Sequence, residues 1–162
     1  MGKRTSDIVG AIIIGAISLP LYPFIILAIR LDSKGPIFYR QKRVGRADKI
    51  ITLVKFRTML HDAEKTGPVW ASENDARTTR VGRFIRKTRI DELPQVWNVF
   101  RGEMSFVGPR PERPEFHDKL QKEIPFYEER YLAKPGLTGW AQVKHKLDFR
   151  GGMTIADTYE KL

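Results

Sequence analysis

The chain has 162 residues and a net charge of +10, from 29 Lys and Arg against 19 Asp and Glu. This length fits one domain, and the absence of cysteine excludes disulfides and thiolate metal sites. The basic charge suits an anionic partner, but no helix-turn-helix, zinc-finger or aromatic RNA-binding motif accompanies it, so we expect no nucleic-acid partner.

The first predicted element is an apolar segment at residues 8–29, which carries no formal charge. As one helix it would reach about 33 Å at ~1.5 Å per residue, enough to cross a hydrocarbon core of ~30 Å. Pro20 and Pro23 interrupt it, because neither can donate a hydrogen bond to the preceding turn. Ser18 stands beside the break, where its hydroxyl can cap it locally.

The two halves of this segment are each too short to cross a bilayer. Basic residues such as Lys3 and Arg30 stand at both ends, which favours leaving both ends in the cytoplasm. We therefore predict a re-entrant membrane helix at residues 1–31, broken at the prolines. The alternatives are a kinked single-pass anchor, a cleaved signal peptide and a buried helix of a soluble core.

Residues 32–162 are predicted to form a second unit, cytosolic and associated with the membrane. It begins with two β-rich runs, 37–43 and 49–57, which flank a turn around Gly45 and predict a small β-hairpin. Basic residues dominate this stretch and indicate contact with anionic lipid headgroups. At the other end, a capping pattern opens a helix at Thr154 that has barely two turns, so we expect the natural domain to continue beyond Leu162.

The next helix is predicted to begin at Asn74 or Asp75. Its narrow apolar stripe of Val81, Phe84 and Ile85 lies against arginines, as in amphipathic helices that rest on a membrane interface. An ordinary surface helix with a solvated basic face is the alternative interpretation.

A further helix is predicted at residues 91–101. Its apolar residues recur at i, i+3, i+4 and i+7 from Leu93, with Asp91 as the N-cap and Pro94 in the first turn. Helices at 114–122 and 125–133 follow. The fold class that these patterns predict is α/β and mainly helical.

Asp91 and Glu92 are adjacent acids at this predicted helix start, where ordinary capping is the alternative explanation. The positive end of the helix, Arg86 one turn upstream and Arg110 downstream would gather phosphate oxygens and a divalent cation here. Oxygen ligands suit Mg²⁺, and a carboxylate is a competent nucleophile toward phosphorus. The two acids are therefore candidate metal ligands and catalytic residues.

Arg110 lies between Pro109 and Pro111, so its backbone is restricted and little entropy is lost in aiming the guanidinium at a phosphate. A solvent-facing arginine in a turn is the alternative. The chain contains no P-loop, GxGxxG, GxSxG or HExxH motif, so P-loop hydrolysis, dinucleotide redox chemistry and zinc proteolysis lack their usual signatures.

The sequence resembles the bacterial sugar transferase family, the monotopic polyprenyl-phosphate phosphoglycosyl transferases. The resemblance lies in KFRTM at 55–59, IDELPQVWNVFRGEMSFVGPRP at 90–111 and KPGLTGWAQV at 134–143. The basic start and the proline-broken apolar segment are similar to the re-entrant membrane helix of that family. The chain after Gln142 matches the family only loosely.

The resemblance implies transfer of a sugar 1-phosphate from a nucleotide diphospho-sugar, expected to be a UDP-sugar, to polyprenyl (undecaprenyl) phosphate with release of UMP. Asp91 would form a covalent phosphosugar intermediate, and Glu92 would assist with Mg²⁺ or proton handling. The implied substrate-binding residues are Lys55, Arg57, Arg86, Arg110 and Gln142.

The same resemblance implies membrane lipids as partners and a place on the cytoplasmic face of the bacterial inner membrane. There the protein would catalyse the first membrane step of glycoconjugate, lipopolysaccharide or exopolysaccharide synthesis. The alternative is a non-catalytic adaptor that binds membrane surfaces through its basic faces. The sequence leaves open the sugar, the polyprenyl chain length and the oligomeric state, and a homodimer is compatible with it.

Overall fold

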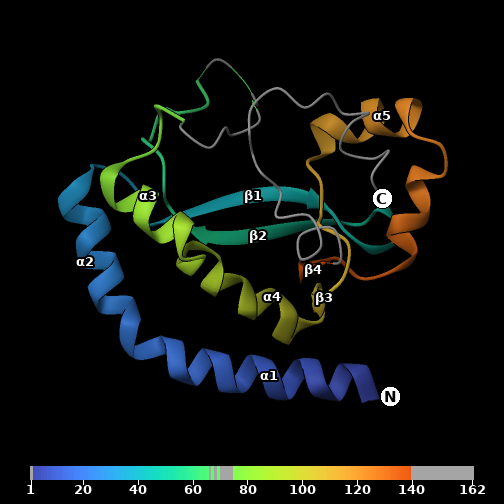
Figure 1. Ribbon diagram of the computed structural model, residues 1–162, viewed down its shortest axis with the longest axis horizontal. Coiled ribbons are helices and arrows are strands. Elements are labelled where there is room, and N and C mark those ends of the chain that lie inside the picture. Colours follow the sequence, from blue (N-terminus) through green and yellow to red (C-terminus); the bar gives the residue numbers. More distant parts are fainter. Residues whose placement is uncertain (1, 66, 68, 70–74, 140–162) are drawn as a thin grey trace.

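The computed structural model describes residues 2–65, 67, 69 and 75–139. Gln142 and the pattern at Thr154 lie outside these residues. The structure is mixed α/β, with a bent N-terminal helix that runs along one side of the remaining elements (Figure 1). The elements, with η for 3-10 helices, are α1 (Gly2–Ser18), η1 (Leu19–Leu21), α2 (Tyr22–Asp32), β1 (Phe38–Val44), η2 (Arg46–Asp48), β2 (Ile50–Phe56), α3 (Arg80–Lys87), η3 (Ile90–Gln95), α4 (Val96–Arg101), β3 (Ser105–Val107), α5 (Pro114–Glu123), η4 (Tyr127–Leu132) and β4 (Gly136–Thr138).

The N-terminal helix changes direction between α1 and α2, where η1 replaces regular α-helix (Figure 1). Pro23 cannot donate to the carbonyl of Leu19, and this carbonyl accepts from the backbone N–H of Tyr22 instead. The hydroxyl of Ser18 donates to the carbonyl of Gly15 at 3.2 Å. Residues 2–32 are long and apolar enough to cross a membrane by length and composition, and 11% of their most apolar window is buried within the chain.

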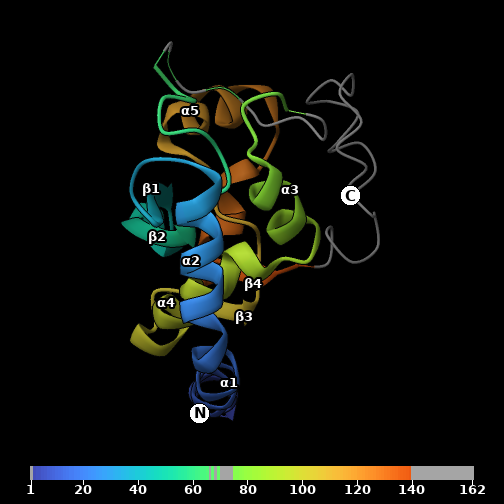
Figure 2. The ribbon, with the colours of Figure 1, turned by 90° about the vertical axis from the view of Figure 1, so that its left-hand side faces the viewer.

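Both ends of the bent helix are tied to the rest of the structure. Near the start, the guanidinium of Arg4 donates to the carbonyls of Val99 and Phe100 in α4, both at 2.7 Å. The carboxylate of Asp7 accepts from the hydroxyl of Ser105 at 3.0 Å. At the far end, the carboxylate of Asp32 accepts from the backbone N–H of Val81 at 2.8 Å, at the start of α3. α1 therefore lies along α4 (Figure 1), and α2 lies beside α3 (Figure 2).

The predicted β-hairpin is confirmed. β1 and β2 pair antiparallel, with Phe38 opposite Phe56 and Val44 opposite Ile50. The turn between them contains two non-glycine residues at positive φ, Ala47 at 52° and Asp48 at 56°. A short parallel pair of β3 and β4, absent from the sequence prediction, forms a second sheet.

The predicted start of α3 at Asn74 or Asp75 is wrong. α3 begins at Arg80, because the hydroxyl of Thr79 caps it by accepting from the N–H of Gly82 at 2.9 Å. The carboxylate of Asp75 instead pairs with the guanidinium of Arg77 at 2.6 Å. At Gly82 an added Cβ would overlap the carbonyl of Thr58, so glycine permits α3 to approach the chain that follows β2.

The predicted helix at 91–101 is divided in two, and Asp91 is not its N-cap. Arg89, in left-handed conformation with φ 60°, precedes η3, and regular α-helix starts only at Val96. Pro94 accounts for the delay, because it has no N–H for an α-helical hydrogen bond. The helix at 114–122 is confirmed as α5, whereas the one predicted at 125–133 forms the 3-10 helix η4.

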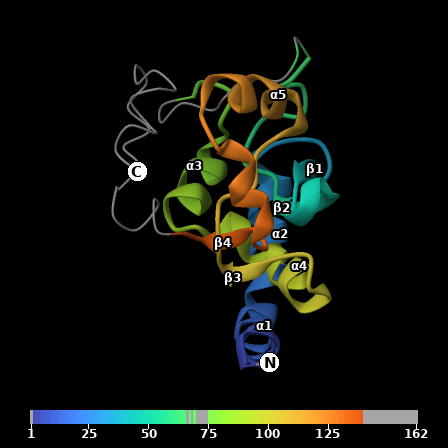
Figure 3. The ribbon, with the colours of Figure 1, turned by 90° about the vertical axis from the view of Figure 1, so that its right-hand side faces the viewer.

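Within the part of the chain that the structure describes, the apolar interior consists of three clusters that meet along the hairpin. One joins Ile25 and Ile29 of α2 to Phe56 and Ile85, and a second joins Ala11 of α1 to β2 and α4. The third packs α5 and η4 against the end of β1, above the β3–β4 pair in Figure 3. The hairpin thus connects the bent N-terminal helix to the segment at 90–112, which carries the candidate site.

Candidate active site

Three of the predicted site residues, Lys55, Glu92 and Arg110, lie together in the structure. η3 packs against β2, which places the ammonium of Lys55 2.8 Å from Oε1 of Glu92. The guanidinium of Arg110, from the loop after β3, lies 3.4 Å from the same oxygen. The side chains of Lys55 and Glu92 are 17% and 13% exposed. Three separate elements therefore converge on one small region of mixed charge.

Glu92 is held ionised by its neighbours. Burial acts to raise its pKa, but the positive charges of Lys55 and Arg110 outweigh burial and bring the pKa to about 2. Burial also lowers the pKa of Lys55, which the negative charge of Glu92 opposes. At neutral pH Glu92 is therefore a carboxylate that fixes two cations, and its low pKa makes it a poor proton donor or acceptor.

Asp91 has a different environment from its neighbour. It is 7% exposed, and its Oδ1 is buried without a hydrogen-bond partner among the described residues. Burial raises the pKa of Asp91, and the negative charge of Glu92 acts in the same direction, while Lys55, Arg86 and Arg89 oppose the rise. The result is a partly desolvated carboxylate surrounded by cations, which is a reactive arrangement toward an electrophilic phosphorus.

Arg86 and Arg57, two other predicted binding residues, lie in different parts of the structure: Arg86 is near Asp91, and Arg57 is not. Arg86 lies on α3, donates to the hydroxyl of Thr78 at 3.2 Å and contributes positive charge at Asp91. Arg57 is placed elsewhere, because its guanidinium donates to the carbonyls of Ser33 and Lys34 at 2.7 and 2.8 Å. Those bonds tie the chain after α2 to the end of β2, so Arg57 supports the fold and does not contact the Lys55–Glu92–Arg110 cluster.

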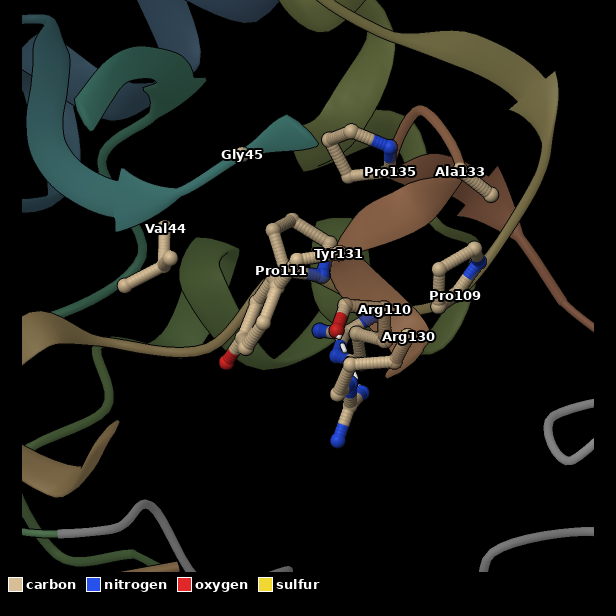
Figure 4. Close-up of a pocket in the computed structure, with 9 residues that line it drawn as sticks. All are labelled: Val44, Gly45, Pro109, Arg110, Pro111, Arg130, Tyr131, Ala133 and Pro135. Atoms are coloured by element: carbon tan, nitrogen blue, oxygen red, sulfur yellow. Dashed lines mark hydrogen bonds between the residues drawn. The ribbon is translucent and has the colours of Figure 1, made fainter. Parts of the chain in front are cut away.

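The loop that carries Arg110 is braced by residues that the sequence analysis missed. Arg130 from η4 donates to the carbonyl of Arg110 at 2.8 Å, and Arg43 from β1 donates to the carbonyl of Pro111 at 3.0 Å. No short-range pattern in the sequence indicates these contacts. Beside the loop lies a shallow depression, lined by Arg110, Arg130 and Tyr131 together with three prolines (Figure 4).

The predicted magnesium site fits Asp91 better than Glu92. The described residues contain no group of three or more His, Cys, Asp or Glu side chains that could hold a metal ion. Oε1 of Glu92 already faces two cations, whereas Oδ1 of Asp91 accepts no hydrogen bond from the described residues. Mg²⁺ is commonly bound by one or two carboxylates completed by substrate phosphates and water, and Asp91 offers that kind of ligand.

Comparisons with known proteins agree with the resemblance seen in the sequence. The sequence model of the bacterial sugar transferase family matches residues 1–160. The UDP-N-acetylgalactosamine-undecaprenyl-phosphate N-acetylgalactosaminephosphotransferase of Aeromonas hydrophila is 46% identical over 147 residues, which are 88% of this chain and 34% of that protein.

Two other relatives carry a different sugar in their names. UDP-glucose:undecaprenyl-phosphate glucose-1-phosphate transferases of Caulobacter vibrioides and Escherichia coli are 45% and 42% identical. The matches cover 93% and 99% of this chain but 55% and 33% of those proteins. The chain thus spans about a third to a half of the length of these three relatives.

Proposed function

This chain belongs to the bacterial sugar transferase family, and we propose that it transfers a sugar 1-phosphate from a UDP-sugar to undecaprenyl phosphate and releases UMP. The observation that carries the proposal is Asp91, a buried carboxylate whose Oδ1 has no hydrogen-bond partner among the described residues and which feels the charges of Lys55, Glu92, Arg86 and Arg89. The names of the relatives supply the class of donor and acceptor.

The proposed reaction has two displacements at one phosphorus atom. In the first, a carboxylate oxygen of Asp91 attacks the β-phosphorus of the UDP-sugar, and the bond from that phosphorus to the bridging oxygen breaks. UMP leaves with the bridging oxygen, and the sugar phosphate remains on Asp91. In the second, a phosphate oxygen of the lipid attacks the same phosphorus, which releases Asp91 and forms the undecaprenyl diphospho-sugar.

The neighbouring residues have electrostatic tasks in this scheme. Arg86 and Arg89 favour the ionised, nucleophilic form of Asp91 against the effect of burial. Arg110 faces the charge that develops on the phosphoryl oxygens, and Lys55 balances Glu92 so that the guanidinium of Arg110 stays in place. Glu92 acts here by fixing the two cations, because a carboxyl group with a pKa of about 2 carries no proton at neutral pH.

Mg²⁺ belongs to the proposal as a bound cofactor. Asp91 would hold it together with donor phosphate oxygens and water, and the ion would supply neutralisation of the diphosphate charge. The residues of this chain position the donor around it.

The proposed arrangement in the membrane is a helix that enters and leaves through the same face. Three contacts support it: Arg4 and Asp7 near the start and Asp32 at the end all bind the same body of structure. Exposed apolar side chains between them, such as Ile17 and Phe24, need a lipid environment. The site would then lie at the cytoplasmic surface of the inner membrane, where a lipid phosphate meets a soluble nucleotide sugar.

The test is incubation of the purified chain with UDP-sugars and Mg²⁺ in the absence of lipid acceptor. We expect release of UMP together with a sugar-phosphate mass adduct on the peptide that contains Asp91. Asp91→Asn should abolish both, and Asp118→Asn, an exposed change on α5, should leave both intact. Transfer to lipid by an enzyme that never shows the adduct would exclude the covalent route. Equal behaviour of Asp91→Asn and wild type would favour the non-catalytic adaptor.

A further inference from the structure

The first turns of α1 bind the strand β3. The carboxylate of Asp7 accepts hydrogen bonds from the hydroxyl of Ser105 at 3.0 Å and from the backbone N–H of Phe106 at 3.2 Å. The ammonium of Lys3 donates to the carbonyl of Val107 at 3.0 Å. Each residue of β3 is therefore bonded to α1, and one carboxylate holds two of them.

This contact is buried and closely packed. Asp7 is 7% exposed and Ser105 is 1% exposed. Removing a carboxylate from water is costly unless it is hydrogen-bonded, so the two bonds from β3 stabilise Asp7 in this position. Beside them, Gly10 of α1 faces the ring of Phe106, where an added Cβ would lie 2.8 Å from Cε2. A shift of α1 would therefore displace β3 as well.

β3 needs this support because its own sheet is small. It pairs in parallel with β4, and each strand has three residues. Two short strands alone are not stable in water, and parallel pairing is slightly weaker per residue than antiparallel pairing. β3 contacts both α1 and β4, and it lies between them in Figure 1. α1 therefore provides the second contact that fixes this strand.

The chain runs from β3 directly to Arg110. The backbone N–H of Gly108 donates to the carbonyl of Thr138 at 3.0 Å, and the N–H of Gly136 donates to the carbonyl of Pro109 at 2.9 Å. The hydrogen bonds of this region thus continue as far as the residue before Arg110. On its other side, the loop is held by the contacts from η4 and β1 described above. The backbone of Arg110 lies between two supports, and β3 forms the N-terminal one.

We propose that Asp7 is a positioning residue, which holds Arg110 beside Glu92 through β3. This inference rests on the proposed function, in which Arg110 faces the phosphoryl oxygens. The guanidinium of Arg110 lies 3.4 Å from Oε1 of Glu92, and a displacement of about 1 Å in a positioned group can cost ~100-fold in rate. The N-terminal helix thus sets the geometry of a phosphate-binding side chain, in addition to contacting the membrane.

The test is a double-mutant cycle between Asp7 and Arg110. The rate of UMP release would be measured for the full chain in lipid nanodiscs, with whichever of UDP-N-acetylgalactosamine, UDP-glucose and other UDP-sugars the wild type uses. We expect Asp7→Ala to slow release about tenfold and Arg110→Gln about a hundredfold. The double variant should be less than about twofold slower than Arg110→Gln, because Asp7 then has no guanidinium left to position. Asp7→Asn should regain most of the rate, since its amide oxygen can accept the same two hydrogen bonds.

Asp32→Ala is the matched control. Asp32 ends the same bent helix, and its carboxylate accepts from the backbone N–H of Val81 at 2.8 Å, but this bond leads to α3 and not to β3. Asp32→Ala should therefore change the rate by the same factor in the wild type and in Arg110→Gln. Hydrogen exchange gives a readout that needs no activity. Exchange in residues 105–112 should become faster in Asp7→Ala and stay unchanged in Asp32→Ala.

Thermal unfolding checks that each variant is folded at the assay temperature. If Asp7→Ala does not fold, Ser105→Ala takes its place, because it removes one of the two bonds and keeps the carboxylate. Equal factors for the Asp7 substitution in the wild type and in Arg110→Gln would overturn the inference, while UMP release by the wild type would show that the proposed function stands. Unchanged exchange of residues 105–112 in Asp7→Ala would overturn it as well. A wild type that neither releases UMP nor transfers sugar phosphate would overturn the proposed function and this inference with it.

Discussion

Replacing Lys55 by methionine tests the ion pair at the centre of the site. The ammonium of Lys55 and Oε1 of Glu92 are 2.8 Å apart, and both side chains are largely buried. The pKa of Glu92 lies at about 2 where 4.5 is ordinary, because the charges of its neighbours outweigh the effect of burial. At ~1.4 kcal/mol per pKa unit, this amounts to roughly 3 kcal/mol in favour of the carboxylate.

The net cost of the substitution is smaller than this figure. Burial lowers the pKa of Lys55, so desolvation of the ammonium offsets part of the gain, and Arg110 remains 3.4 Å from Glu92 in the variant. We therefore expect Lys55→Met to lower the free energy of unfolding by about 2 kcal/mol at pH 7, below the ~3–5 kcal/mol for a buried charge left without any partner. For a chain of this size, the thermal midpoint would fall by about 4–8 °C.

The pH dependence follows from the depressed pKa of Glu92. Its stabilising contribution is complete above the unfolded value of 4.5 and is lost as the pH falls toward about 2. Thermal unfolding of wild type and Lys55→Met should therefore differ most at neutral pH and converge as the pH is lowered through this window. A difference that stays constant from pH 7 to pH 3 would contradict this account.

Lys65→Met is the matched control. The ammonium of Lys65 lies 3.0 Å from Asp62, almost the same separation, but these side chains are 75% and 52% exposed. Solvent screens such a pair, so we expect no measurable change in the midpoint. Equal losses in Lys55→Met and Lys65→Met at pH 7 would refute the reasoning that burial makes the site pair important.

Three further predictions concern other parts of the structure. Asp91→Asn should raise the thermal midpoint at neutral pH, because burial raises the pKa of this carboxyl group and its ionised form destabilises the fold there, and the gain should disappear at acidic pH where Asp91 is protonated. Gly82→Ala should lower the free energy of unfolding by about 2 kcal/mol through overlap with the carbonyl of Thr58, measured by denaturant titration, and an unchanged midpoint would contradict it. Single cysteines at Lys3 and Ser33 in sealed vesicles should react with an impermeant reagent from the same side, whereas opposite sides would mean a spanning helix.

Several features could be predicted from the sequence because they depend on neighbouring residues. The alternating β-rich runs around Gly45 predict the hairpin, and the segment at 90–111 carries the family resemblance together with both acids. The prolines at 20 and 23 mark the part of the apolar segment where η1 interrupts regular helix. Each of these signals is contained within a few tens of residues.

Only the tertiary structure decided how the candidate site is held. Arg57 looked like a binding residue because it stands two positions from Lys55, a spacing that shares one face within a strand. β2 ends at Phe56, however, and the guanidinium of Arg57 binds the chain after α2. Arg130 and Arg43 reach the Arg110 loop from positions 20 and 68 residues away in the chain, measured to the residues whose carbonyls they bind.

Helix boundaries were decided in the same way. The N-cap of α3 is Thr79 and not Asp75, because the carboxylate of Asp75 forms an ion pair with Arg77. The N–H of Val81 in the first turn donates to Asp32 at the end of α2. The sequence by itself thus determined the local elements and the identity of the acids, since periodicity and proline act over short distances. Packing decided which charges meet, because ion pairs and buried carbonyls are satisfied by whichever side chains the fold brings within about 3 Å.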